Sequence, residues 1–315
     1  MQRSLREYFT ITLKGMAMGA ADVVPGVSGG TIAFITGIYQ ELILTISGVN
    51  LALLQIWKEQ GFKAMWKEAN GSFVLALLSG IFISIFSLMR FTNYLLEEHP
   101  VLIWSFFFGL ILASIWFVAK QIPTWNYKIV IGLIAGAIIA YYIVSLPPSQ
   151  AVTSNWYLFL SGAIAICAMI LPGISGAFIL VLMGVYKTVT EAAHEFDFTT
   201  LGIVAAGAVV GLLSFSHILK WLFAHYSSLT LAVLTGFIAG SLNKIWPWKE
   251  VLETAQFGEK TMVVREASVL PWNFPGEPHL FQAVILMLAG FLLILILERV
   301  ASQKPLDPHA ANPDL

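Results

Sequence analysis

The chain has 315 residues, of which 58% are hydrophobic and 11% charged, and its mean hydropathy is +0.81. Soluble domains of this length carry about a quarter charged residues, so the composition excludes a soluble protein and predicts a polytopic membrane protein. The formal net charge of −1 gives no electrostatic reason to expect nucleic acid as a partner. The single cysteine, Cys167, excludes an internal disulfide and a multi-cysteine metal site.

The first predicted element, Thr10–Ile56, is apolar but is interrupted by the motif DVVPGVSGG at residues 22–30. Its first arm, Thr10–Val24, has 15 residues. As a helix this arm reaches about 22 Å, less than the roughly 30 Å of a bilayer core. The region is therefore predicted to be a re-entrant hairpin whose proline and glycines form a tip inside the membrane. Trp156–Val189 repeats the pattern around MILPGISGA at residues 169–177.

The remaining apolar segments are long enough to be full transmembrane helices, three after the first motif and three after the second. They are Gly71–Thr92, Val101–Ala119, Lys128–Leu146, Thr200–Phe223, Ser228–Ile245 and Leu280–Glu298. The fold class is therefore all-α, with the whole chain as a single integral membrane domain. The tail at residues 301–315 is polar, contains three prolines and is predicted to be disordered.

The distribution of basic residues predicts that both termini are cytoplasmic. With that orientation, the short outer loops carry two basic residues, Arg90 and Lys187. The inner segments carry eleven, which satisfies the positive-inside rule. These are Arg3, Arg6, Lys14, Lys58, Lys63, Lys67, Lys120, Lys128, Lys220, Arg299 and Lys304.

The two motifs mark an internal repeat, with one half at about residues 10–146 and the other at about residues 156–299. When Pro25 is aligned with Pro172, Ser28 meets Ser175. The later spans also align, and glycines and other small residues recur at matched positions, where they let helix backbones approach closely. Each half has one hairpin and three crossings, so the second half is predicted to enter the membrane from the opposite side. Such inverted repeats with discontinuous helices are typical of secondary transporters.

Each motif is predicted to place a helix N-terminus inside the bilayer, because proline ends the preceding helix. Ser28 is expected to cap a helix that starts near Thr31. Free N–H groups at such a terminus bind anions, phosphate above all, although kinks that relieve strain at helix crossings are the alternative interpretation. The predicted phosphate-binding residues are Gly26, Val27, Ser28, Gly29, Gly30 and Thr31 at the first tip, and Gly173, Ile174, Ser175, Gly176 and Ala177 at the second. At the second tip, Ser175 is the expected hydroxyl.

Charged side chains within membrane segments are costly and often functional. Asp22, beside the first tip, is predicted to carry a coupling proton or bind a cation, with capping of the chain break as the alternative. Glu41, also considered for a coupling role, lies at the far end of the first hairpin, where an interfacial position explains it equally well. Arg90 and His217 align in the repeat and are predicted to meet a phosphate from the outer and inner sides, unless they only snorkel to the interface.

The segments KGMAMGAADVVPGVSGGTIAFITGIYQEL (residues 14–42) and MILPGISGAFILVLMGVY (residues 169–186) resemble the bacterial polyprenyl-phosphate transporter family, PopT, formerly known as a domain of unknown function. The resemblance extends over about residues 8–300. It implies that the protein returns undecaprenyl phosphate, the carrier lipid of cell-envelope synthesis, from the outer to the inner leaflet for reuse. The roles considered for Asp22, Glu41 and Arg90 rest on the residues alone.

Two other functions remain open from the sequence. The same tips would serve a secondary transporter of a small soluble anion. A membrane enzyme such as a lipid phosphatase is disfavoured, because Ser28 has only Asp22 nearby in the sequence and no histidine beside it. No nucleotide-binding motif is present and no cofactor is expected, so a gradient is the predicted driving force, with protons, sodium and the membrane potential as open alternatives.

Overall fold

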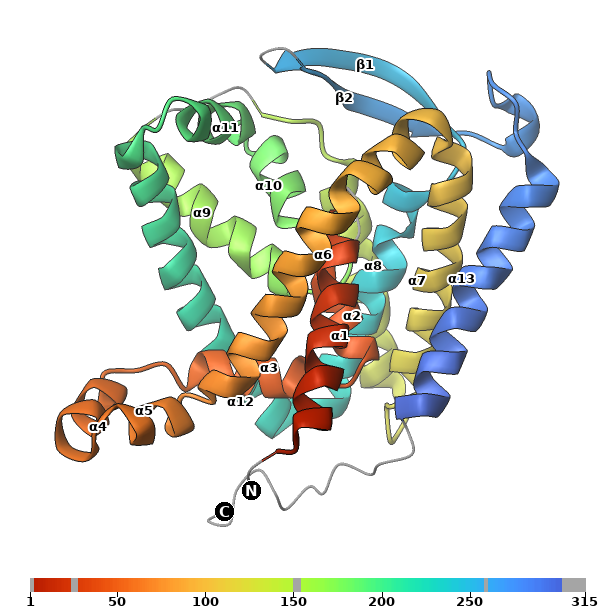
Figure 1. Cartoon of the computed structure of the whole chain (residues 1–315). Helices are drawn as coiled ribbons and strands as arrows, with labels where there is room; N and C mark the ends of the chain where they lie inside the picture. Colours follow the sequence, from red (N-terminus) through yellow and green to blue (C-terminus); the bar gives the residue numbers. More distant parts are fainter. Residues whose placement is uncertain (1–2, 24–27, 150–153, 258–259, 302–315) are drawn as a thin grey trace.

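The computed structural model describes residues 3–23, 28–149, 154–257 and 260–301, and the chain in these ranges is mostly helical (Figure 1). The α-helices are α1 (Leu5–Asp22), α2 (Gly29–Ile35), α3 (Tyr39–Ser47), α4 (Ala52–Gln60), α5 (Phe62–Glu68), α6 (Gly71–Glu98), α7 (Pro100–Lys120), α8 (Tyr127–Ser145), α9 (Asn155–Ile170), α10 (Gly176–Leu182), α11 (Tyr186–His194), α12 (Phe198–Gly240) and α13 (Leu280–Ala301). The other elements are the 3-10 helices η1 (Ser241–Ile245) and η2 (Pro271–Asn273) and the strands β1 (Lys249–Phe257) and β2 (Lys260–Ser268). The predicted disordered tail lies almost entirely outside the described residues.

Several helices begin directly after a polar residue whose side chain accepts a hydrogen bond from an N–H of the first turn. Ser4 precedes α1 and forms a capping box with Glu7, because the Ser4 N–H donates to the Glu7 carboxylate at 2.8 Å and the Glu7 N–H donates to Ser4 Oγ. Asn126 caps α8 through the N–H of Ile129. Asp197 caps α12. These caps fix where the long apolar helices start, because the first N–H groups of a helix have no partner within it.

Four helices in the described ranges are long and apolar enough to cross a membrane, or up to six if each of two bent helix pairs counts as one span. α6, α7 and α8 coincide with three predicted spans. The predicted spans Thr200–Phe223 and Ser228–Ile245 both fall within α12 and η1. The backbone of Tyr226, between them, leaves the helical region with φ −137° and ψ 45°. α13 occupies the last predicted span and is apolar over Leu280–Ile296.

The two bent pairs follow the two sequence motifs. α2 and α3 meet at 115°, and α10 and α11 meet at 110°. Both bends contain a glycine in the left-handed region, Gly37 with φ +73° and Gly184 with φ +71°, a conformation that other residues rarely adopt. These short, bent pairs have the form expected of re-entrant segments. In Figure 1, α3 and α11 lie at opposite ends of the molecule.

Glycines bring the first helix of each half against the next long helix. A side-chain carbon on Gly15 of α1 would lie 2.2 Å from the Leu77 carbonyl oxygen, and one on Gly80 of α6 would lie 2.0 Å from the Thr12 carbonyl oxygen. The second half repeats this contact between α9 and α12. There, a carbon on Gly162 would lie 2.2 Å from the Val204 oxygen, and one on Gly207 would lie 1.9 Å from the Phe159 oxygen. The residues in contact are those that the sequence alignment of the halves pairs with one another.

The last helix of each half packs on the other half. In α8, a side chain on Gly136 would meet the Val233 carbonyl of α12 at 2.4 Å, and in α13 a side chain on Gly290 would meet the Phe106 carbonyl of α7 at 2.1 Å. These glycines are also aligned partners in the repeat. The two halves are therefore interlocked rather than side by side, and small residues are needed at each crossing because the backbones touch.

Gly207→Ala is expected to destabilise the protein by about 1–3 kcal/mol, because the added methyl overlaps the Phe159 carbonyl and forces α9 and α12 apart. The matched control is Gly202→Ala in the same helix, where nothing lies within 4 Å of the added carbon. That change should stabilise α12 by roughly 1 kcal/mol, since alanine favours a helix over glycine. Thermal unfolding of both variants in detergent measures the difference. Equal midpoints would show that this contact does not hold the helices together.

The segment between η1 and α13 contains an antiparallel hairpin of β1 and β2. Its register pairs Lys249 with Ser268 and is shifted between Val251 and Thr254. Figure 1 shows this hairpin at the end of the molecule opposite to α4 and α5. These strands lack the strict alternation of apolar and polar residues that predicts a half-buried strand, because Val251 and Leu252 are adjacent, as are Val263 and Val264.

Candidate functional site

The first motif forms the start of α2, a helix in which every residue is buried. α2 begins at Gly29, two residues earlier than predicted, and Ser28 is its N-cap, as expected. Ser28 Oγ accepts the N–H of Gly30 at 3.1 Å, and Asp22 Oδ1 accepts the N–H of Gly29 at 2.7 Å. The protein's own oxygens therefore occupy the N–H groups that were predicted to bind an anion. Gly26 and Val27, predicted to belong to this tip, lie outside the described residues.

The second motif forms the start of α10 with a different set of partners. Gly173 has φ +96°, and a side chain there would collide with Ser241 Oγ at 2.8 Å and with the Phe237 carbonyl at 3.0 Å. Ser175 precedes α10 but makes no capping hydrogen bond. Ile174 and Gly176 are buried, Ser175 is half-buried and Ala177 is exposed. The second tip is thus held by packing more than by side-chain caps.

The two tips differ at one aligned position. Asp22 lies against Gly29, where a side-chain carbon would be 2.5 Å from the Asp22 carboxylate. In the second half, Met169 takes the place of Asp22, and its Cβ lies 3.3 Å from the position of a carbon on Gly176, the partner of Gly29. At this aligned position, the first half therefore has an ionisable residue and the second half an apolar one.

The two motifs also touch one another in the protein interior. The Ser28 hydroxyl donates to the carbonyl oxygens of Met169, at 3.2 Å, and Leu171, at 3.4 Å. In return, the N–H of Gly173 donates to Thr31 Oγ1 at 3.0 Å. Ser28 is 1% exposed and Thr31 is fully buried. The structure thus joins the tips, which lie more than 140 residues apart in sequence, through reciprocal hydrogen bonds.

Ser175 is not the only hydroxyl at the second tip. Thr31 of the first motif and Ser241 of η1 both bring hydroxyl groups to Gly173. Neither contact has a local sequence signal, because each depends on how separate helices pack. Thr31 was recognised as a tip residue, but its partner across the repeat was not.

The other predicted polar residues lie away from this contact. Glu41 forms a two-point ion pair with Arg3, at 2.7 and 2.8 Å, and accepts from Asn70 Nδ2 at 2.9 Å. His217 is exposed on α12 and its Nδ1 contacts the Leu213 carbonyl of the same helix at 2.7 Å. Arg90 belongs to α6, but its side chain is not among those described. Of the predicted ionisable residues whose side chains are described, Asp22 is the one that the structure brings to the tips.

Lys14 stabilises the other end of α2. Its Nζ donates to the carbonyl oxygen of Thr36, just after the last residue of α2, at 2.5 Å. A cation at the C-terminus of a helix interacts favourably with the helix dipole, as a carboxylate does at the N-terminus. The buried helix α2 is therefore held between Asp22 at its start and Lys14 at its end.

Comparison with known proteins identifies the family to which this chain belongs. The model of the undecaprenyl phosphate translocase-like family matches residues 18–262, which include both motifs. The chain belongs to that family. The undecaprenyl phosphate translocase-like proteins are transporters and not enzymes.

Two relatives agree with this assignment over nearly their whole length. The polyprenyl-phosphate transporter of Vibrio cholerae serotype O1 is 48% identical over 302 residues, which are 94% of this chain and 98% of that protein. The polyprenyl-phosphate transporter of Staphylococcus aureus is 31% identical over 310 residues, covering 93% and 96%. No solved structure matches the chain significantly. Within the described part of this translocase-like chain, no group of histidine, cysteine, aspartate and glutamate residues has the arrangement of a metal site.

Proposed function

We propose that this protein moves undecaprenyl phosphate from the outer to the inner leaflet of the bacterial cytoplasmic membrane, which returns the lipid for cell-envelope synthesis. The observation that carries the proposal is the reciprocal contact of the two motif tips, Ser28 with Met169 and Thr31 with Gly173, in a family of lipid-phosphate translocases. A phosphate head needs a polar site at membrane depth, and backbone and hydroxyl groups supply one without a buried positive charge.

The transport cycle is proposed to use an inverted repeat. Its support is that aligned glycines make aligned contacts in both halves and that α3 and α11 lie at opposite ends of the molecule. If the halves enter the membrane from opposite sides, rocking one against the other exposes the contact between the tips to each leaflet in turn. The prenyl tail stays in hydrocarbon throughout. The basic end with Arg3 and Lys58 is proposed to face the cytoplasm, together with both termini.

Phosphate binding is proposed to require an exchange of acceptors at the first tip. Asp22 and Ser28 occupy the N–H groups of Gly29 and Gly30, so a phosphate oxygen gains them only by displacing these side chains. An ionised Asp22 would repel the phosphate at this distance. We therefore propose that Asp22 takes up a proton as the phosphate binds and releases it as the phosphate leaves, which couples transport to a proton gradient.

The test is a translocation assay with purified protein in proteoliposomes, using fluorescently labelled farnesyl phosphate, a short polyprenyl phosphate, and a membrane-impermeant quencher. Labelled lipid should cross the bilayer at least about tenfold faster than in protein-free vesicles. Excess inorganic phosphate should leave this rate unchanged. Uptake of radiolabelled inorganic phosphate into the vesicles, without lipid movement, would instead indicate a transporter of a small soluble anion and would refute the proposal.

A further inference from the structure

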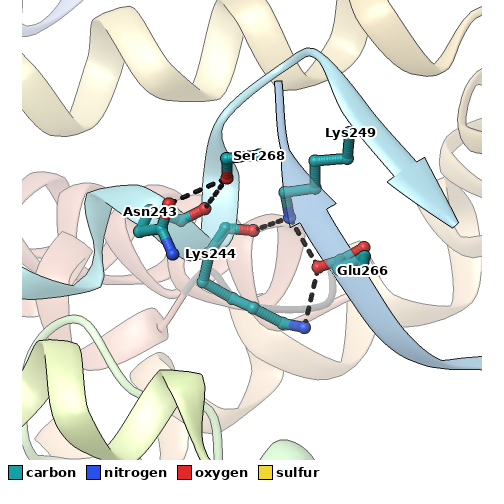
Figure 2. A network of polar contacts seen from close by, with 5 residues as sticks. All are labelled: Asn243, Lys244, Lys249, Glu266 and Ser268. Atoms are coloured by element: carbon teal, nitrogen blue, oxygen red, sulfur yellow. Dashed lines mark hydrogen bonds and ion pairs between the residues drawn. The ribbon is translucent and has the colours of Figure 1, made fainter. Parts of the chain in front are cut away.

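Two lysines at the base of the hairpin share a single carboxylate oxygen. Glu266 Oε1 lies 2.9 Å from Lys244 Nζ and 2.7 Å from Lys249 Nζ, as Figure 2 shows. Lys249 Nζ also donates to the carbonyl oxygen of Lys244. The side chain of Lys249 is 10% exposed, and those of Lys244 and Glu266 are 24% and 23% exposed. Among the described side chains, this cluster therefore holds one positive charge more than its carboxylate balances.

The cluster lies next to the second motif. η1 carries Ser241 and Lys244, and residues three apart on a 3-10 helix lie on the same side. Ser241 faces Gly173, and Lys244 Nζ lies 4.9 Å from the centre of the Phe178 ring in the first turn of α10. The lysines therefore lie over the second tip from the hairpin end of the molecule.

Each of the two lysines also lies against an aromatic ring. Lys249 Nζ lies 5.2 Å from the centre of the Trp104 ring in α7. The rings of Trp246 and Trp248, on either side of the turn into β1, are 5.3 Å apart. Tryptophan is enriched where membrane hydrocarbon meets water, and lipid head groups lie at that depth. The excess positive charge is thus placed where the head of an arriving lipid would be.

The chemistry of the cluster suits a phosphate monoester. Each ammonium has three N–H donors, and the contacts with Glu266 and the Lys244 carbonyl leave further donors on both lysines. A phosphate monoester brings at least one negative charge and three acceptor oxygens, which neutralise the excess charge and use those donors. The hydroxyl head of a polyprenyl alcohol brings no negative charge and only one acceptor oxygen.

We propose that Lys244 and Lys249 form a receiving site for the phosphate head of a lipid at the hairpin end of the molecule, from which the head passes to the second motif. The proposal rests on the proposed function and names the residues that first meet its substrate. Glu266 pairs with the two ammonium groups in the absence of the ligand and competes with the phosphate for them.

The test measures binding of farnesyl phosphate to the full-length protein in detergent, using tryptophan fluorescence, with farnesol and inorganic phosphate as comparison ligands. Lys244→Met and Lys249→Met should each weaken farnesyl phosphate binding at least about tenfold. Glu266→Gln should strengthen it about threefold, because the competing charge is gone. Farnesol should bind equally to all variants, and inorganic phosphate should bind the wild type at least about tenfold more weakly than farnesyl phosphate does, because it has no tail.

Lys187→Met is the matched control, since Lys187 forms an exposed pair with Glu191 on α11. It should bind as the wild type does. The opposite signs expected for the lysine and glutamate variants separate a ligand site from a structural ion pair, which would lose binding in both cases. If Lys249→Met does not fold, the more exposed Lys244→Met decides the question. Unchanged affinity in Lys244→Met, or weaker binding in Glu266→Gln, would overturn the proposal.

The pH profile gives a second measurement. Burial lowers the pKa of Lys249 to about 8, with Glu266 of β2 and Lys244 of η1 as the charged groups that face it among the described residues, and Trp104 of α7 beside it. Wild-type affinity for farnesyl phosphate should therefore fall as the pH rises through 8, because Lys249 loses its charge. In Lys249→Arg this fall should be absent, since arginine stays protonated. An identical pH profile in both proteins would count against Lys249 as a ligand.

The binding and translocation measurements can refute the receiving site and the proposed function independently of each other. If the wild type translocates farnesyl phosphate while the lysine variants bind it normally, the receiving site is refuted and the proposed function stands. If the wild type binds farnesyl phosphate through these lysines but moves none across the bilayer, the proposed function is refuted and the site remains as a lipid-phosphate receptor.

Discussion

Ser28→Leu is expected to reduce lipid translocation in proteoliposomes to the rate of protein-free vesicles. Ser28 is 1% exposed and lies between the Gly30 N–H and the carbonyls of Met169 and Leu171. Leucine removes the cap of α2 and overfills the contact between the tips. Together these changes cost about 2–4 kcal/mol. The tips would then be held apart, and a phosphate would lose the hydroxyl that joins the two halves.

A matched control separates this effect from simply placing leucine in a membrane helix. Ser87 is exposed on α6, and its hydroxyl bonds only carbonyls of its own helix, at 2.6 Å to Ile83 and 3.4 Å to Ser84. Ser87→Leu should translocate within about twofold of the wild-type rate, because leucine is favourable against lipid. Ser28→Ala removes the hydrogen bonds without overfilling the site, so its translocation rate should lie between those of Ser28→Leu and Ser87→Leu. A folded Ser28→Leu protein with the wild-type rate would rule out a transport role for this contact.

Asp22→Asn is expected to abolish the stimulation of translocation by a proton gradient while leaving the fold intact. The asparagine carbonyl oxygen can still accept the Gly29 N–H, which Asp22 Oδ1 accepts at 2.7 Å. What the substitution removes is the negative charge and the site for a proton. The stimulated rate should fall at least about tenfold, to the level of wild type without a gradient. Asp22→Ala should in addition lose stability, because the Gly29 N–H is left without its acceptor.

The measurement compares translocation with and without an imposed pH gradient, then with a protonophore, and finally with a sodium gradient in its place. Asp197→Asn is the control, since Asp197 also caps a helix, at the N–H groups of Thr199 and Thr200, but is exposed. It should keep the full response. If Asp22→Asn responds to the proton gradient as the wild type does, Asp22 is a helix cap alone and the coupling proposal is wrong. A response to sodium only would assign the coupling to a different ion.

Several features of the fold were predictable from particular residues. Ser28 was expected to cap a helix, and it does, because serine at that position satisfies an N–H that has no partner within the helix. The aligned glycines were expected to allow close helix contacts, and Gly80 and Gly207 make equivalent contacts in the two halves. Such predictions succeed because capping, glycine geometry and apolar length act locally or repeat along the chain.

Other features required the folded chain. Nothing near Thr31 in the sequence indicates that it accepts the Gly173 N–H, and nothing near Lys244 indicates that it shares a carboxylate with Lys249. The sequence around Glu41 does not indicate its ion pair with Arg3, which lies 38 residues earlier. These pairings depend on the crossing angles and rotations of whole helices, which small packing differences decide.

By itself, the sequence determined that the chain spans a membrane, that it carries two related motifs, and that each motif breaks a helix. Apolar length, proline and glycine impose these properties on any fold the chain adopts. Only the tertiary structure decided that the two tips meet through Ser28 and Thr31, and that the N–H groups of Gly29 and Gly30 at the first tip are already occupied by Asp22 and Ser28. The physical reason is that a hydrogen-bond partner is chosen by position in space, and packing between distant helices sets that position.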